Sequence, residues 1–256
     1  MNGVLAAGLW GLLGGSALVL GAGIAWVATL PQRLIAGIMA IGSGVLISAV
    51  AFDLMDEAFA RGGFDSTAAG FLGGAVVYTA ANIVVSRRGA RHRKRSGSNP
   101  DESQPDAGKG DGGSGTAIAI GALLDGIPES VVIGVSLLGG GGVSFVTVAA
   151  VFLSNVPEGL SSAAGMKAAG RSARYVFGVW IGIALASGIA AMAGNWLLAG
   201  ADPDLIAGTT AVAAGAILAM LVDTMIPEAT ESTHEYSGLI AVTGFLLAFI
   251  LSKLGG

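Results

Sequence analysis

The sequence predicts an all-α integral membrane protein with eight transmembrane helices in a 3+2+3 arrangement, in which helices 1–3 and 6–8 form an inverted repeat around helices 4 and 5. Composition is the first reason. Of the 256 residues, 53% are apolar and 12% are charged, whereas a soluble domain is about 25% charged. The 43 glycines fit this class, because membrane helices approach each other through small residues. The chain has no cysteine, so oxygen or imidazole would have to hold any metal.

Apolar segments of the right length are the second reason. A transmembrane helix needs about 20 mainly apolar residues, and turn residues such as Pro31 and the run of glycines from Gly139 to Gly142 separate the segments. The first segment lacks the basic n-region of a signal peptide, so we expect it to be a span. The expected spans are approximately residues 4–28, 33–59, 66–86, 116–138, 144–166, 174–199, 205–230 and 237–254.

One joint between the expected helices is long. Residues 87–115 are polar, rich in Gly and Ser, and almost free of apolar side chains, so we expect a disordered loop. This loop divides one membrane domain into residues 1–86, with helices 1–3, and residues 116–256, with helices 4–8.

The distribution of Lys and Arg predicts the orientation, because cytoplasmic loops carry the positive excess. With both termini extracytoplasmic, the basic residues of the 87–115 loop and those of residues 167–174 fall inside, while only Arg61 and Lys253 fall outside. We therefore expect a multi-pass protein of the plasma (inner) membrane with loop 87–115 in the cytoplasm. The basic cluster of this loop is interpreted as a topology determinant that touches anionic lipid, not as a nucleic-acid site.

Two similar motifs indicate the inverted repeat. AFDLMDEA, residues 51–58, ends the second span, and LVDTMIPEA, residues 221–229, ends the seventh. The two spans run in opposite directions, and inverted repeats around a midplane site are a common design of transporters. Chance similarity is the alternative for so short a match.

Another motif occurs twice, as LLDGIPES (residues 123–130) and FLSNVPEG (residues 152–159), in the middle of helices 4 and 5. A carboxylate at that depth costs at least a few kcal/mol, so each Glu is a candidate functional residue. Each proline removes a helical hydrogen bond, so we expect kinks and freed carbonyls at Leu124 and Leu153.

The polar residues of the doubled motif have helical spacing. Asp125 lies four residues before Glu129, and Ser154 lies four before Glu158, so each pair shares a helix face. If the two helices face each other, these side chains and Asn155 form an oxygen-rich pocket for a divalent cation. For one copy alone, a kink with a carboxylate paired to a buried polar group would be the simpler interpretation, but two copies favour a cation site.

These residues resemble the ZIP (Zrt-, Irt-like protein) family of divalent metal transporters, in a divergent bacterial-type form. The matches are Pro128-Glu129, Asn155-x-Pro157-Glu158-Gly159, the Asp-Glu end of helix two, Ile226-Pro227-Glu228 on helix seven, and the long loop after helix three. The resemblance implies that zinc, manganese, iron or cadmium is imported toward the cytoplasm by an elevator-like movement. It also implies a binuclear site bridged by Glu129 and Glu158, with the metal as substrate and no cofactor.

The departures from the family pattern concern the ligands. Asp125 and Ser154 stand where the family usually has His, and Ala191 stands where helix six often carries Glu. An all-oxygen set suits manganese or magnesium better than zinc. We therefore expect a single-metal site in place of the binuclear one.

Acidic residues of helices two and seven are candidates for a transport pathway, since the resemblance implies that they serve as entrance and exit. Asp53, Asp223 and Glu228 lie deeper than the others and are favoured over ordinary interfacial charges. For the remaining side chains both interpretations stay open; these are Asp56, Glu57, Glu231, His234 and Glu235.

Other functions are weighed against transport of metal. No enzyme is expected, because both histidines lie in loops and Ser154 has no His or Lys partner in its helix. A proton-coupled carrier of another solute would also use intramembrane carboxylates, but aromatic residues for a larger cavity make up only 6% of the chain. A ZIP-like fold that has lost efficient transport and acts as a metal-binding sensor or scaffold is a further alternative. The Gly and Ala faces permit a homodimer within the bilayer.

Overall fold

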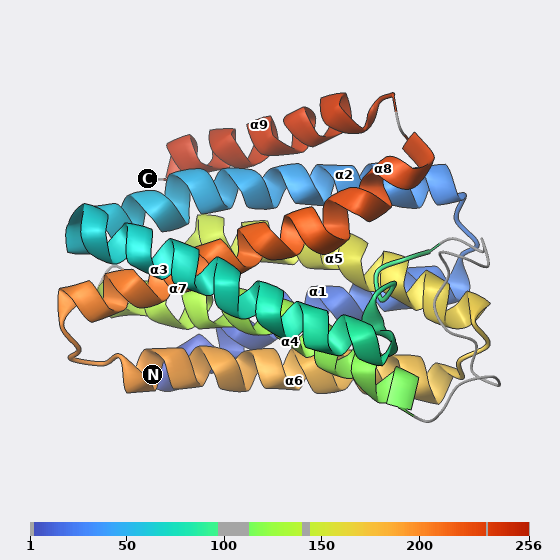
Figure 1. The fold of residues 1–256 in the computed structure, drawn as a ribbon, viewed down its shortest axis with the longest axis horizontal. Coiled ribbons are helices and arrows are strands. Elements are labelled where there is room, and N and C mark those ends of the chain that lie inside the picture. Colours follow the sequence, from blue (N-terminus) through green and yellow to red (C-terminus); the bar gives the residue numbers. More distant parts are fainter. Residues whose placement is uncertain (1–2, 97–112, 140–143, 234, 256) are drawn as a thin grey trace.

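The computed structural model describes residues 3–96, 113–139, 144–233 and 235–255. All regular structure in these residues is helical, as predicted, and the helices run side by side along one axis (Figure 1). The elements, in which η denotes a π-helical or 3₁₀ turn, are α1 (Gly3–Val27), α2 (Gln32–Ala49), η1 (Val50–Leu54), α3 (Met55–Val85), η2 (Ser86–Ala90), α4 (Gly113–Ser136), η3 (Leu137–Gly139), α5 (Phe145–Ala168), α6 (Ala173–Leu197), α7 (Pro203–Met220), η4 (Leu221–Met225), α8 (Ile226–Thr233) and α9 (Ser237–Gly255).

The helices are compatible with a multi-pass membrane protein. Within the described residues, six segments are long and apolar enough to cross a membrane, fewer than the eight spans expected. Large apolar side chains face outward, among them Leu72, Val76 and Leu239, each about two-thirds exposed. An apolar exterior is what contact with lipid requires. The six segments are Gly3–Val27, Gln32–Ala90, Thr116–Ser136, Ala173–Leu197, Pro203–Glu231 and Ser237–Leu254.

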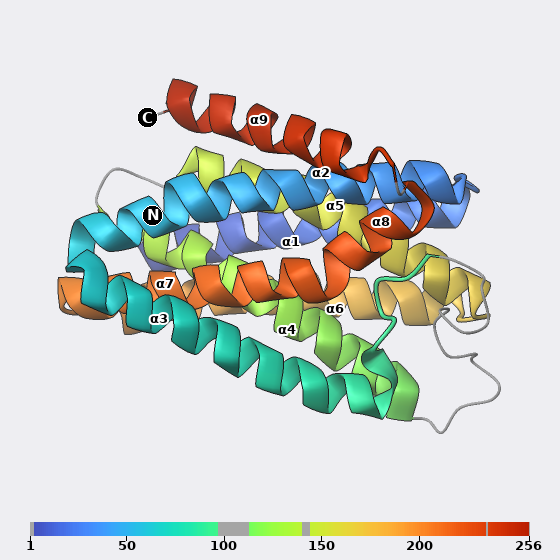
Figure 2. The ribbon, with the colours of Figure 1, turned by 45° about the horizontal axis from the view of Figure 1, so that its top comes forward.

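The longest of these segments is not one rod. It is broken inside α3 at Gly63, whose φ of 66° and ψ of −166° are non-helical. Only glycine adopts a positive φ at little cost, so this residue permits the chain to reverse. The break lies between the second and third expected spans. Figure 2 shows the two arms of α3 diverging from this corner.

Glycines bring the paired helices into backbone contact. α2 packs against α9, and α3 packs against α7. A Cβ added at Gly74 of α3 would lie 1.9 Å from the carbonyl oxygen of Val212, and one added at Gly215 of α7 would lie 1.9 Å from that of Phe71. Any larger residue would therefore push these helices apart, as expected for small-residue packing in membranes.

The two similar motifs have the same local structure. Asp53 lies in the π-helical turn η1, which follows α2, and Asp223 lies in the π-helical turn η4, which follows α7. Such turns are rare in proteins, and those that occur are often found at functional sites. The motifs therefore share a backbone feature as well as their residue pattern.

Part of the expected loop is ordered, which corrects the prediction of disorder for residues 87–115. Residues 86–90 continue α3 as the π-helical turn η2, and residues 91–96 follow as a defined segment, here called the basic arm. Its sequence, RHRKRS, holds no apolar residue, and ion pairs inside the bundle stabilise it instead of a hydrophobic core. Residues 113–115 belong to α4, and residues 97–112 lie outside the described part.

The helix directions place the basic arm. The start of α1 and the end of α9 lie at one end of the bundle, and the arm enters from the opposite end (Figures 1 and 2). The end of α8 lies at the same end of the bundle as the arm.

Candidate functional site

All five side chains predicted to bind a cation are buried. Asp125 and Glu129 of α4 are each 1% exposed, and Ser154, Asn155 and Glu158 of α5 are at most 4% exposed. Both helices continue through their prolines without a break, so the expected kinks do not interrupt them. Polar residues thus occupy the interior of a bundle whose outside is apolar.

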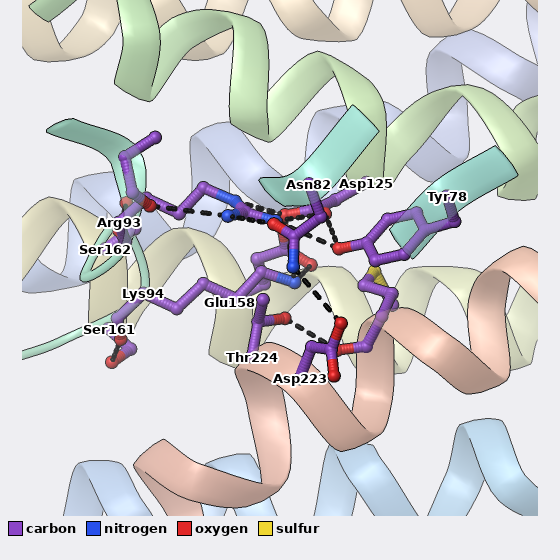
Figure 3. A network of polar contacts seen from close by, with 12 residues as sticks. Tyr78, Asn82, Arg93, Lys94, Asp125, Glu158, Ser161, Ser162, Asp223 and Thr224 are labelled. Carbon is purple, nitrogen blue, oxygen red and sulfur yellow. Dashed lines mark hydrogen bonds and ion pairs between the residues drawn. The ribbon is translucent and has the colours of Figure 1, made fainter. Parts of the chain in front are cut away.

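The basic arm supplies the main partner of Asp125, which sequence analysis did not foresee. Arg93 is 2% exposed and donates to both oxygens of the Asp125 carboxylate (Figure 3). Its Nε lies 2.9 Å from Oδ2, and its NH2 lies 2.8 Å from Oδ1. Burial alone would lower the pKa of Arg93, but the carboxylate outweighs burial and the pKa is raised. Arg93 is therefore a charged occupant of the site.

Lys94 joins the two halves of the doubled motif. Its Nζ lies 3.3 Å from Oδ2 of Asp125 and 3.0 Å from Oε2 of Glu158 (Figure 3). Lys94 is itself only 3% exposed. The two carboxylates and the two cations of the arm balance in charge. Such balance is needed, because an unpaired charge in a protein interior costs several kcal/mol.

The backbone of the arm is anchored to α5 and α8. Ser161 donates to the carbonyl oxygen of Lys94 at 2.6 Å, and Ser162 donates to that of Arg93 at 2.5 Å. The amide of Ser96 donates to Oε1 of Glu228 at 2.9 Å. These bonds hold the two cationic side chains in register with the carboxylates.

Two further polar residues of α3 complete the network. The hydroxyl of Tyr78 donates to Oδ1 of Asp125 at 2.7 Å and accepts from Arg93 at 2.9 Å. Asn82 accepts from Arg93 at 3.0 Å and donates to Oδ2 of Asp223 at 3.2 Å (Figure 3). Tyr78 and Asn82 are four residues apart and so share a helix face. That spacing within an apolar segment was the signal that sequence analysis overlooked.

Glu129 differs from the other carboxylates of the site. It is buried, and neither of its oxygens has a hydrogen-bond partner among the described residues. The remaining predicted ligands are bound to backbone: Ser154 donates to the carbonyl of Val151 at 2.9 Å, and Asn155 donates to that of Gly14 at 3.1 Å. Glu129 is thus the predicted ligand that the protein itself leaves unsatisfied.

The expected pocket of converging oxygens is occupied by the arm in this arrangement. Within the described residues, no group of three or more His, Asp and Glu side chains is placed to hold a metal ion together. The reason is visible in Figure 3, where Arg93 and Lys94 reach between the helices and take the positions beside Asp125 and Glu158.

The acidic residues of the seventh expected span, which lie in η4 and α8, join this network. Glu228 is 1% exposed and accepts hydrogen bonds from Ser96, and the hydroxyl of Ser161, which donates to the carbonyl of Lys94, lies 2.9 Å from Oε1 of Glu228. Glu231 binds Arg95 of the arm, and Asp223 binds Asn82. His234, also predicted, lies outside the described residues.

The acidic residues of the second expected span lie in η1 and α3, and their contacts are elsewhere. Asp53 accepts a hydrogen bond from Ser252 of α9 at 2.7 Å, and Glu57 pairs with Arg61 one turn away at 2.7 Å. Asp56 is exposed. Within the described part of the chain, Asp53 and Glu57 thus pair with residues outside the basic arm and the doubled motif, so the acidic ends of the second and seventh expected spans are separate.

Comparisons with known proteins add no family. No family model matches the chain, and no curated protein matches it. Fold and site alone define the class, which is an all-helical protein compatible with several membrane crossings and carrying a buried network of carboxylates and cations.

Proposed function

We propose that the protein is a divalent metal cation transporter that moves its substrate across the plasma membrane toward the cytoplasm. The observation that carries the proposal is the burial of Asp125, Glu129 and Glu158 inside an apolar bundle. Carboxylates at such a place are costly and mark ion pathways by default. The substrate class is zinc, manganese, iron or cadmium, and oxygen ligands favour manganese.

The proposal includes eight spans with both ends outside. The break at Gly63 divides the longest apolar segment in two, and α5, with 24 residues, is long enough to cross a bilayer. Dividing that segment in two and adding α5 turns the six apolar segments into eight candidate spans. The start of α1 and the end of α9 at the same end of the bundle agree with an even number.

An inverted repeat of helices 1–3 and 6–8 is supported by the way the helices pack. α2 packs against α9 and α5, while α7 packs against α3 and α4. Likewise α1 packs against α5, and α6 packs against α4. Each of these contacts of α1 and α2 thus has a counterpart in a contact of α6 or α7. In addition, Asp53 and Asp223 both lie in π-helical turns. Resemblance to the ZIP family, in residues of α4 and α5, supports an elevator-like movement.

The residues proposed to hold the transported ion are Glu129, Glu158 and Asp125. Glu129 is unsatisfied and therefore ready to bind, whereas the other two must first exchange the cations of the arm. Ser154 and Asn155 would have to turn from the backbone carbonyls they bind.

Uptake into vesicles tests the proposal. Protein reconstituted in liposomes that enclose a metal-sensitive dye should take up Mn²⁺, and Glu129→Gln combined with Glu158→Gln should abolish uptake. Asp65→Asn combined with Asp204→Asn is the matched control, because both side chains are exposed and neither belongs to the site. If the double variant transports as well as the unmodified protein, the site assignment is wrong.

A metal-binding sensor or scaffold is the second candidate, since the arm fills the site. It predicts that the protein binds Mn²⁺ in detergent but takes up none into liposomes. Uptake that depends on Glu129 and Glu158 excludes it.

A further inference from the structure

The basic arm occupies the carboxylate site with two positive charges. Arg93 and Lys94 are 2% and 3% exposed, although they come from a polar segment that would be fully hydrated outside the bundle. Between them they neutralise Asp125 and Glu158 at distances of 2.8 to 3.3 Å. Burying an Arg and a Lys is costly unless each is closely paired with an opposite charge, and here both are.

We infer that Arg93 and Lys94 are a tethered, exchangeable substitute for a divalent cation, so that the arm and the transported ion exclude each other. This inference rests on the proposed function. A single divalent ion replaces both charges of the arm, whereas a monovalent ion replaces only one and leaves a buried carboxylate uncompensated. The arm thereby selects for charge: withdrawal becomes favourable when an ion of charge two takes its place.

The anchors of the arm suit exchange. Its backbone is held by the hydroxyls of Ser161 and Ser162 and by Glu228, at the end of the bundle where the arm enters. No apolar side chain of the arm is packed into the core, since its sequence is RHRKRS. Contacts of this kind can be replaced by water without exposing apolar surface.

A cavity lies beside the arm. Its volume is about 410 Å³, and it is lined by Arg91, His92, Lys94 and Arg95 of the arm and by Asp223, Thr224 and Pro227. Asp223 offers a carboxylate to a cationic side chain that leaves the site. Lys94 borders both the carboxylates and this cavity, so its withdrawal needs no passage through apolar packing.

Metal affinity is the first test. Arg93→Ala with Lys94→Ala should bind Mn²⁺ about 10- to 100-fold more tightly than the unmodified protein, because an arm that fills the site 90 to 99% of the time weakens apparent affinity by that factor. Titration calorimetry of the purified protein measures it. Arg87→Ala with Arg88→Ala is the matched control, since it removes two charges just before the arm at exposed positions and should leave affinity unchanged.

Because removing both cations leaves carboxylates unpaired, a milder variant is included. Ser161→Ala with Ser162→Ala keeps every charge and removes two anchors, so it should also raise Mn²⁺ affinity, by a smaller factor. Equal affinities in the unmodified protein and in both variants would overturn the inference and leave the proposed function standing.

A labelling experiment follows the arm itself. The chain has no cysteine, so Ala90→Cys, at a fully buried position next to the arm, gives one reporter thiol. Mn²⁺ should speed its alkylation about tenfold or more, whereas Na⁺ at equal ionic strength should not. Thr29→Cys, exposed and lining a pocket together with Ser96 of the arm, should react fast in all conditions.

The same thiol separates the two possible failures. Asp125→Asn with Glu158→Gln should release the arm and expose Ala90→Cys without any metal. If the arm is released but no protein binds or transports a divalent metal, the proposed function fails while the pairing of arm and carboxylates stands. An unchanged labelling rate in this variant, or in the Mn²⁺ experiment, would contradict the inference that the arm and the metal ion exchange.

Discussion

The Nζ atom of Lys94 lies 3.0 Å from Oε2 of Glu158, and both side chains are at most 5% exposed. One residue comes from a polar connecting segment, and the other from the middle of an apolar helix. This ion pair therefore joins the polar connecting segment to an apolar helix that is long enough to cross a bilayer.

We expect the ion pair of Lys94 and Glu158 to be strongly coupled. Removing one partner of a buried pair costs about 3 to 5 kcal/mol, because the other charge is left without compensation. Lys94→Met and Glu158→Gln should each destabilise the protein, and the double variant should cost less than the sum of the two. Thermal unfolding in detergent measures the coupling. Strictly additive losses would show that the two charges do not depend on each other.

Glu129→Gln should behave differently from Glu158→Gln. Neither oxygen of Glu129 has a partner among the described residues, so no ion pair is lost when the carboxylate becomes an amide. We expect its thermal stability to equal or exceed that of the unmodified protein, while Mn²⁺ uptake is lost. Loss of stability by more than about 1 kcal/mol, the usual contribution of one hydrogen bond, would reveal a partner for Glu129.

Tyr78→Phe should destabilise the charged network without changing its shape. The hydroxyl donates to Asp125 and accepts from Arg93, and hydrogen bonds to charged groups contribute about 1.5 to 3 kcal/mol. We expect a loss within that range, measured by chemical unfolding in detergent. Tyr236→Phe is the control, because Tyr236 is 64% exposed and should change stability very little. Equal effects at the two positions would contradict the role of the hydroxyl.

Gly74→Ala should disrupt packing between α3 and α7, whereas Gly73→Ala should not. An added Cβ at Gly74 would lie 1.9 Å from the carbonyl oxygen of Val212, but at Gly73 it would meet nothing within 4 Å. Overpacking costs about 1 to 3 kcal/mol, and Ala favours a helix over Gly by about 1 kcal/mol. The adjacent variants should therefore shift thermal stability in opposite directions. An equal rise in stability for both variants would show that α3 and α7 accommodate the added methyl group at Gly74 without a cost in packing.

Much of the site was accessible to sequence reasoning because its signals are local. The four-residue spacing of Asp125 and Glu129 and the matching Pro-Glu pairs placed polar groups on α4 and α5, and all of them are buried. The turn at Gly63 also follows from local chemistry, since a glycine pair interrupts two apolar segments. Helical class and apolar exterior need only composition and segment length.

The partners of these residues were not accessible in the same way. Arg93 and Asp125 are 32 residues apart, and the segment that holds Arg93 has no periodicity and almost no apolar residue. Read alone, RHRKRS predicts a hydrated loop, and its order is explained by carboxylates contributed from α4, α5 and α8.

Composition and spacing thus led to helices, an apolar exterior and buried carboxylates, because each of these depends on residues close together in the chain. Which cation sits beside Asp125 and Glu158 depended on packing of α3, α4 and α5, because charge compensation in a dry interior is a matter of distance in space. The arm reaches the carboxylates only once the helices have assembled around the place where its two cations are stable.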